Sequence, residues 1–328
     1  MKKFNIFLIS VLGCLAAACS DPAGGNMSPD NEEVAGESGT MAGVTFAAAS
    51  DDITVFAFRK EGNDYKYRKT FTGEWVADDL QENVYRRRAK ISSGTYKFMF
   101  VKGYGQNLTL FPAAPGNDTD FGDIGFNLAS DDGYYLSADE LFLEKNPETI
   151  VPYDVHRTSI VSSTLSRAVS RIDVNLNRGY YDNGVYVGVP FEKGNSILDL
   201  FEGIELTING AGTFVGLSGG QGSGTVKHSL QGSDYDEITD QGFARFTGPY
   251  IIPTGKEFDV KVALLPAQGS DYPVLVKDFT GNSLLRNEKL TLNLWVTESA
   301  DDSEIIINIT AETAPITDLS EGEAGMWD

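Results

Sequence analysis

Short runs of alternating apolar and polar residues follow one another along most of the chain. Residues 53–59, 96–101 and 204–208 are rich in β-branched and aromatic side chains and are bounded by turn-forming residues. A period of two residues is typical of β-strands, whose side chains point to opposite faces in turn. The same pattern predicts further strands at residues 134–144, 168–176, 258–265, 274–277, 290–296 and 304–310.

Turn-forming residues separate these runs, and no helical or heptad repeat is sustained. Residues 219–224 are glycine-rich but lack the lysine and the strand-to-helix context of a phosphate-binding loop, so they predict a hairpin loop. Many short strands with glycine-rich connections predict an all-β protein built from antiparallel sandwiches. The clearest turn pairs are Asp132-Gly133, Asn183-Gly184, Asn209-Gly210 and Gly281-Asn282.

The beginning of the chain has the pattern of an export signal. Lys2 and Lys3 precede an apolar run at residues 4–15, which is well below the roughly 20 residues that a membrane-spanning helix needs. The run ends in Leu-Ala-Ala-Ala followed by Cys19, which resembles the lipobox of bacterial lipoproteins. The resemblance implies that Cys19 is acylated and becomes the mature N-terminus. The alternatives are cleavage before Cys14 and an ordinary secreted protein cut at the alanine-rich site.

Charge and cysteine content set the organisation of the mature chain. The formal net charge is −21, and both ends are acidic without bases, which disfavours nucleic acid as a partner. With Cys19 acylated, no second cysteine remains for a disulfide, so packing must stabilise the fold. We expect a signal peptide, a flexible acidic tether, two β-sandwich domains and an acidic tail, at residues 1–18, 19–41, 42–163, 164–312 and 313–328.

Motifs for catalysis or cofactor binding are not found in the sequence. The two histidines, His156 and His228, lack nearby ligands for zinc, and no nucleophile or nucleotide motif occurs. The acidic segments 117–123 and 234–237 do not supply a full calcium-ligand set, so we interpret them as solvated loops. We therefore expect neither an enzyme nor a cofactor.

Three segments resemble one family of surface proteins. Residues 165–176, LSRAVSRIDVNL, closely resemble the strand that opens the second domain of Bacteroidales fimbrillins and of fimbrial-anchor lipoproteins of the FimB/Mfa2 type. Residues 93–98 and 287–296 are similar to two other strands of that family. The resemblance implies two tandem transthyretin-like sandwiches in a surface fimbria whose subunits join by strand exchange. Cys19-Ser20-Asp21 also resembles in part a surface-export signal, which implies lipid anchoring at the outer membrane.

The family resemblance also suggests residues for processing and assembly. Ile305, Ile307 and Ile309 form a candidate donor strand, although an ordinary last strand of the second domain explains them more simply. Family shaft subunits are activated by cleavage after an arginine, and Arg59 is the candidate site. The triple arginine at residues 86–88 is better explained as a solvated strand edge.

Three functions therefore remain open. The sequence favours a fimbrial anchor or assembly subunit, which keeps its lipid and contacts other fimbrial subunits. A polymerising shaft or tip subunit, processed after an internal arginine, is one alternative. The other is a glycan-binding lipoprotein that uses Tyr134-Tyr135 and Tyr180-Tyr181, whose surface ligand is unknown; core or cross-strand packing explains these tyrosines more simply.

Overall fold

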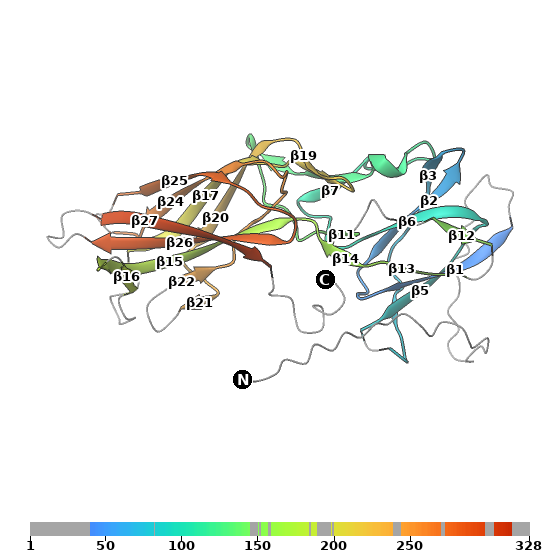
Figure 1. The fold of residues 1–328 in the computed structure, drawn as a ribbon, viewed down its shortest axis with the longest axis horizontal. Coiled ribbons are helices and arrows are strands. Elements are labelled where there is room, and N and C mark those ends of the chain that lie inside the picture. Colours follow the sequence, from blue (N-terminus) through green and yellow to red (C-terminus); the bar gives the residue numbers. More distant parts are fainter. Residues whose placement is uncertain are drawn as a thin grey trace.

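The computed structural model describes residues 40–316, except residues 82, 145–149, 151, 157–158, 184, 189–197, 199, 239–243, 270–272 and 299–304. The regular structure of the described residues is β-strand, apart from one 3₁₀ turn, η1 (Phe121–Asp123), which confirms the all-β prediction. Figure 1 shows an elongated molecule with the early strands at one end and the late strands at the other. None of the described helical segments is long and apolar enough to cross a membrane.

The N-terminal sandwich packs two four-stranded sheets face to face. Sheet 1 has the order β13-β1-β5-β4 and sheet 2 the order β12-β6-β2-β3. Their facing side chains form one buried cluster that includes Phe46, Phe98 and Phe100. The strands of sheet 1 are Ser159–Ser162, Met41–Ala48, Tyr85–Ser92 and Val76–Ala77, and those of sheet 2 are Tyr153–Val155, Gly94–Val101, Thr54–Glu61 and Asp64–Phe71.

The C-terminal sandwich packs two larger sheets. Sheet 4 has the order β25-β24-β17-β20-β10-β9: Leu275–Asn282, Phe258–Pro266, Phe201–Ala211, Gly224–Gln231, Tyr134–Tyr135 and Ser130–Asp131. Sheet 5 has the order β21-β22-β15-β26-β27, and β16 and β23 also pair with β15. These strands are Glu237–Ile238, Ala244–Phe246, Ser170–Asp182, Glu288–Glu298, Ile305–Pro315, Val185–Gly188 and Tyr250–Ile251.

Two smaller sheets connect the sandwiches. Sheet 3 has the order β19-β18-β8-β7, so strands from both halves of the chain share it. Its strands are Gly219–Gln221, Phe214–Gly216, Gly125–Leu128 and Leu108–Phe111. The strands β11 (Phe142–Glu144) and β14 (Leu165–Arg167) form an antiparallel pair. The strands β8 and β10, which precede residue 163, pair with β18 and β20, which follow it. The division into two domains at residues 163 and 164 therefore stays a prediction.

The apolar part of β2, inside sheet 2, is buried on both faces, which explains its sequence. Val55 and Ala57 of β2 pack in the cluster shared with sheet 1, whereas Phe56 and Phe58 pack in the cluster that continues into the C-terminal sandwich. All four side chains are fully buried. A strand that is covered on both sides reads as a continuous apolar run rather than as a strict alternation.

Several turn predictions need correction. Asp132 and Gly133, with φ of 47° and 83°, do form the tight turn between β9 and β10. Asn209-Gly210 instead lies inside β17, where the register shifts and Gly210 has φ 95°, so it forms a β-bulge. Gly281-Asn282 lies at the end of β25 rather than between strands. Residues 134–144, predicted as one strand, contain β10 and β11 with a loop between them.

Candidate functional site

The last strand, β27, lies at one edge of sheet 5. It pairs antiparallel with β26 over its full length, from Ile305 opposite Glu298 to Pro315 opposite Glu288. Among the described strands, β26 is its only partner. The candidate donor residues Ile305, Ile307 and Ile309 therefore lie in a strand that is already paired within its own chain; their side chains lie outside the described residues.

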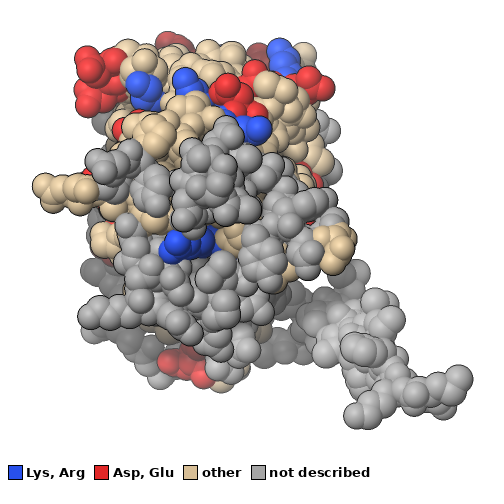
Figure 2. Space-filling model, turned by 90° about the vertical axis from the view of Figure 1, so that its left-hand side faces the viewer, with Lys and Arg blue, Asp and Glu red and all other residues tan. Residues whose placement is uncertain are grey.

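The strand β25 forms the corresponding edge of sheet 4. In Figure 1, β25, β24, β17 and β20 of sheet 4 follow one another from top to bottom, and so do β27, β26, β15 and β22 of sheet 5. The edge strands β25 and β27 therefore lie on the same side of the sandwich. Lys277 and Asp278 of β25 are exposed. Figure 2, which views this end of the molecule, shows basic and acidic side chains interspersed on its upper part. Charged side chains on an edge strand discourage pairing with another chain, so β25 is the better protected edge.

The first strand, β1, is held on both sides within sheet 1. It pairs antiparallel with β5 from Met41 to Ala48 and parallel with β13 from Val44 to Ala47. The sequence pattern did not single out this strand, and it begins at the last residue of the predicted tether. Residues 19–39 of the tether, including Cys19, lie outside the described residues.

The candidate processing site Arg59 lies inside β2, between β3 and β6. Its guanidinium donates a hydrogen bond to the backbone oxygen of Ser93 at 3.0 Å. A proteinase would have to open the sheet to reach the bond between Arg59 and Lys60. The triple arginine lies in β5, between β1 and β4, and Arg87 is buried rather than solvated.

A buried ionic network lies where the two sandwiches meet. Arg167, at the end of β14, donates two hydrogen bonds to one oxygen of Glu140, at 2.8 and 2.5 Å, and a third to Asn287 at 2.8 Å. Tyr250 donates to the same Glu140 oxygen at 2.9 Å. Burial, and then the negative charge of Glu140, raise the pKa of the Tyr250 hydroxyl. The network joins segments that are far apart in the sequence.

A second pair follows directly on β15. Arg171 makes two hydrogen bonds to Asp173, at 2.7 and 2.9 Å, and Lys289 of β26 lies 3.5 Å from the same carboxylate. Arg171 also lies over the ring of Tyr250, 5.9 Å from its centroid. Buried charges must be paired in this way, because a lone charge would carry a large desolvation cost. The network accounts for the polar positions at the start of residues 165–176.

Comparison with known proteins places the chain in a family. The family of fimbrillin-A associated anchor proteins Mfa1 and Mfa2 matches residues 34–213, more than half of the sequence. The chain belongs to this Mfa2 family. Membership makes it a fimbria-associated surface protein and confirms the family resemblance drawn from the sequence. The comparison with curated proteins finds no match.

Solved structures that resemble this Mfa2-family chain are distant in sequence. A candidate adhesin from Bacteroides ovatus has 14% identity and a TM-score of 0.50, over 85% of this chain and 97% of that one. The fimbrial anchor protein Mfa2 from Porphyromonas gingivalis has 12% identity and a TM-score of 0.44, over 83% and 97% of the two chains. A candidate polysaccharide-binding protein from Bacteroides thetaiotaomicron has 13% identity and a TM-score of 0.46, over 85% and 98%. The B. ovatus match supports the all-β fold.

The acidic loops of this Mfa2-family chain are engaged by its own groups. Lys66 of β3 lies 2.8 Å from the carboxylate of Asp120 and donates to the backbone oxygen of Asp118 at 3.3 Å. Asp234 and Asp236 accept hydrogen bonds from backbone N–H groups of Gln231 and Thr247. Within the described part of the chain, no three His, Cys, Asp or Glu side chains are arranged to hold a metal ion.

The candidate glycan-binding tyrosines are not arranged as an open platform. The ammonium group of Lys227 lies 3.5 Å from the centroid of the Tyr134 ring, which is 38% exposed. The Tyr135 ring packs against the position of Gly224, where an added Cβ would lie 2.5 Å from it. The backbone of Tyr180-Tyr181 lies in β15 opposite β16, and its side chains lie outside the described residues. Stacking on sugars is therefore not favoured at Tyr134 and Tyr135.

Proposed function

We propose that this protein is a lipid-anchored fimbrial anchor of the outer membrane that joins other fimbrial subunits by β-strand complementation. The observation that carries the proposal is membership of the Mfa2 anchor family, together with the lipobox-like sequence ending at Cys19. Acylation at Cys19 would hold the chain on the membrane surface. The segment between Cys19 and β1 is long enough to lift the first sandwich off the lipid headgroups.

The position of Arg59 supports an anchor over a processed shaft subunit. Cleavage after Arg59 would remove β1 and also most of β2. The part of β2 that would be lost contains Val55, Phe56, Ala57 and Phe58, all fully buried. Losing both faces of a central strand would destroy the N-terminal sandwich rather than open a groove in it. The chain therefore favours keeping its first strand and its lipid.

The edge of β27 is the proposed place of strand complementation. If β27 acted as a donor strand, it would have to leave β26 together with Ile305, Ile307 and Ile309. This would break an eleven-residue pairing. Adding a neighbour's strand to the outer edge of β27 requires no such loss, so we favour that mode. By sequence, β27 carries one charged residue, Glu312, whereas β25 carries two, Lys277 and Asp278. Fewer charges on an edge oppose the addition of another strand less.

Single-cysteine cross-linking tests this assignment. Thr313 of β27 is exposed, and Thr313→Cys would carry the only free thiol of a mature chain whose Cys19 is acylated. On cells that assemble fimbriae, we expect a zero-length or short cross-link from this thiol to a neighbouring subunit. The matched control is Lys261→Cys, which is exposed on β24 between two paired strands. Equal cross-linking from both positions would argue against complementation at β27.

A further inference from the structure

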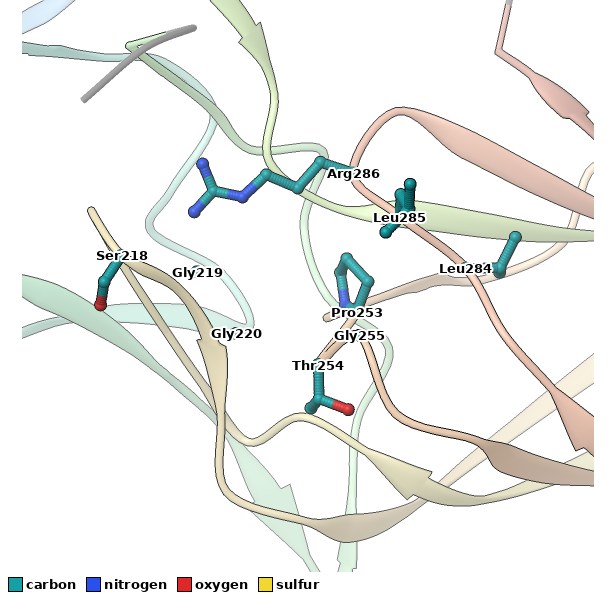
Figure 3. A pocket seen from close by; sticks show the side chains of 9 residues that line it. All are labelled: Ser218, Gly219, Gly220, Pro253, Thr254, Gly255, Leu284, Leu285 and Arg286. Carbon is teal, nitrogen blue, oxygen red and sulfur yellow. The ribbon is translucent and has the colours of Figure 1, made fainter. Parts of the chain in front are cut away.

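A small pocket opens between three loops of the C-terminal half. It lies beside the turn before β19, the loop between β23 and β24, and the loop between β25 and β26. The cavity holds about 180 Å³. Figure 3 shows the side chain of Arg286 stretched along one side of it, with its guanidinium toward the segment Ser218–Gly220. Arg286 has no feature in the sequence that predicts a site.

Arg286 is a half-buried cation at the border of this pocket. One of its N–H groups donates to the backbone oxygen of Gly216 at 3.0 Å. No carboxylate among the described residues forms an ion pair with it. Burial lowers the pKa of its guanidinium, which still remains charged at neutral pH. A desolvated guanidinium with unused donors is a binding site for an anion, because charge-assisted hydrogen bonds are the strongest that it can make.

The remaining walls of the pocket suit a carboxylate on an aliphatic stem. Pro253 and Leu285 contribute apolar surface. Ser218 and Thr254 also line the pocket, but their hydroxyl oxygens accept hydrogen bonds from the Gln221 side chain and the Lys256 backbone N–H, each at 3.3 Å. Leu285 is 62% exposed. No acidic and no aromatic residue lines the pocket.

Two walls of the pocket, β19 and the Pro253 loop, lie in close contact, and this contact requires a glycine at position 220. A Cβ at Gly220 would lie 2.2 Å from the backbone oxygen of Pro253, so any larger residue would push β19 away from that loop. The glycine-rich segment 219–224, predicted as a hairpin loop, thus begins with the strand β19, which packs against the Pro253 loop. The close approach fixes the walls on both sides of the space that Arg286 borders.

The size and lining of the pocket select the ligand. Its volume is below the roughly 300 Å³ at which pockets for drug-sized molecules begin, so it fits a single side chain. The planar guanidinium fork matches a carboxylate through two parallel hydrogen bonds. Without an aromatic wall there is no face on which a sugar ring would stack.

We propose that this pocket binds a glutamate or aspartate side chain of an acidic peptide segment, with Arg286 as the carboxylate-binding residue. The proposal rests on the proposed function only for the source of the peptide, namely an acidic segment of a neighbouring subunit. Binding of a free peptide can be measured without fimbriae. The two proposals can therefore fail separately.

Titration of the full-length chain with a blocked tripeptide that has glutamate at its centre tests the proposal. We expect saturable shifts of the backbone amide signals of Gly219, Gly220 and Gly255 in nuclear magnetic resonance spectra. The same tripeptide with glutamine should give none. In Arg286→Ala the dissociation constant should rise about tenfold or more, because a charge-assisted bidentate contact is lost. The dissociation constant of Arg286→Lys should lie between those of the parent and of Arg286→Ala. Lysine keeps the positive charge but not the planar fork of donors.

Matched controls separate binding from folding. Arg88→Ala removes an exposed arginine of β5 and should leave peptide affinity unchanged. If Arg286→Ala does not fold, Arg286→Lys keeps the test available, and it should bind the peptide more weakly than the parent because the bidentate contact is lost. The proposal is overturned if the glutamate peptide does not shift the three glycines, or if Arg286→Ala binds it as well as the parent. Tighter binding of glucuronate than of the peptide would overturn the assignment to a peptide ligand.

Discussion

Replacing Cys19 with serine is expected to release the protein from bacterial envelopes. A serine hydroxyl does not receive the diacylglyceryl group, so no acyl chains remain to enter the membrane. Two acyl chains are needed for stable anchoring, since one chain binds only marginally. The net charge of −21 gives the released chain no attraction to an anionic membrane surface. The measurement is fractionation of cells, with the protein detected in the envelope and in the supernatant.

The matched control for that experiment is Cys14→Ser, which changes the other cysteine of the sequence. Because Cys14 lies in the predicted signal peptide, this variant should stay in the envelope fraction like the parent. If the Cys14→Ser variant were released instead, the lipidation site would be Cys14 rather than Cys19. If Cys19→Ser still sediments with envelopes as the parent does, the lipid-anchor account is wrong.

Phe46→Ala is expected to destabilise the N-terminal sandwich by about 3–5 kcal/mol, the usual cost of removing a buried aromatic ring. Phe46 of β1 is fully buried, and its ring lies 5.1 Å from that of Phe71, 5.3 Å from Phe98 and 5.9 Å from Phe100. Its loss would leave a cavity where sheets 1 and 2 meet. Hydrogen–deuterium exchange of peptides from β1 should become faster by roughly a hundredfold to several thousandfold, as a loss of that size implies.

Thr45→Ala provides the control, because Thr45 is the half-exposed neighbour of Phe46 on the opposite face of β1. That substitution should cost less than about 1 kcal/mol, which is the range of strand propensities. If the Phe46→Ala variant exchanged no faster than Thr45→Ala, β1 would not be part of the folded sandwich.

Strand patterning predicted most of the late strands but missed several early ones. Those at residues 204–208, 258–265 and 290–296 alternate clearly and lie inside β17, β24 and β26. By contrast β1 is rich in alanine and glycine, so it resembles the tether before it. The strands β3 and β5 carry many lysines and arginines, because much of their surface is exposed or pairs with acidic groups. Local composition does not reveal such pairings.

The junction between the sandwiches was predictable only in part. The sequence singled out residues 165–176, which contain Arg167 and Arg171, through their resemblance to a family strand. Their partners Glu140, Tyr250 and Asn287 come from distant loops and strands, which only the folded chain brings together. Arg286 was missed for the same reason. An arginine in a loop has no sequence signal that separates a solvated side chain from one that borders a pocket.

The central claim is that the mature protein keeps both its lipid and its first strand. Mass spectrometry of the N-terminal peptide, taken from native membranes, tests both points at once. The account predicts a peptide that begins at an acylated Cys19 and continues without a break into β1. An N-terminus at Lys60, which cleavage after Arg59 would leave, would contradict it.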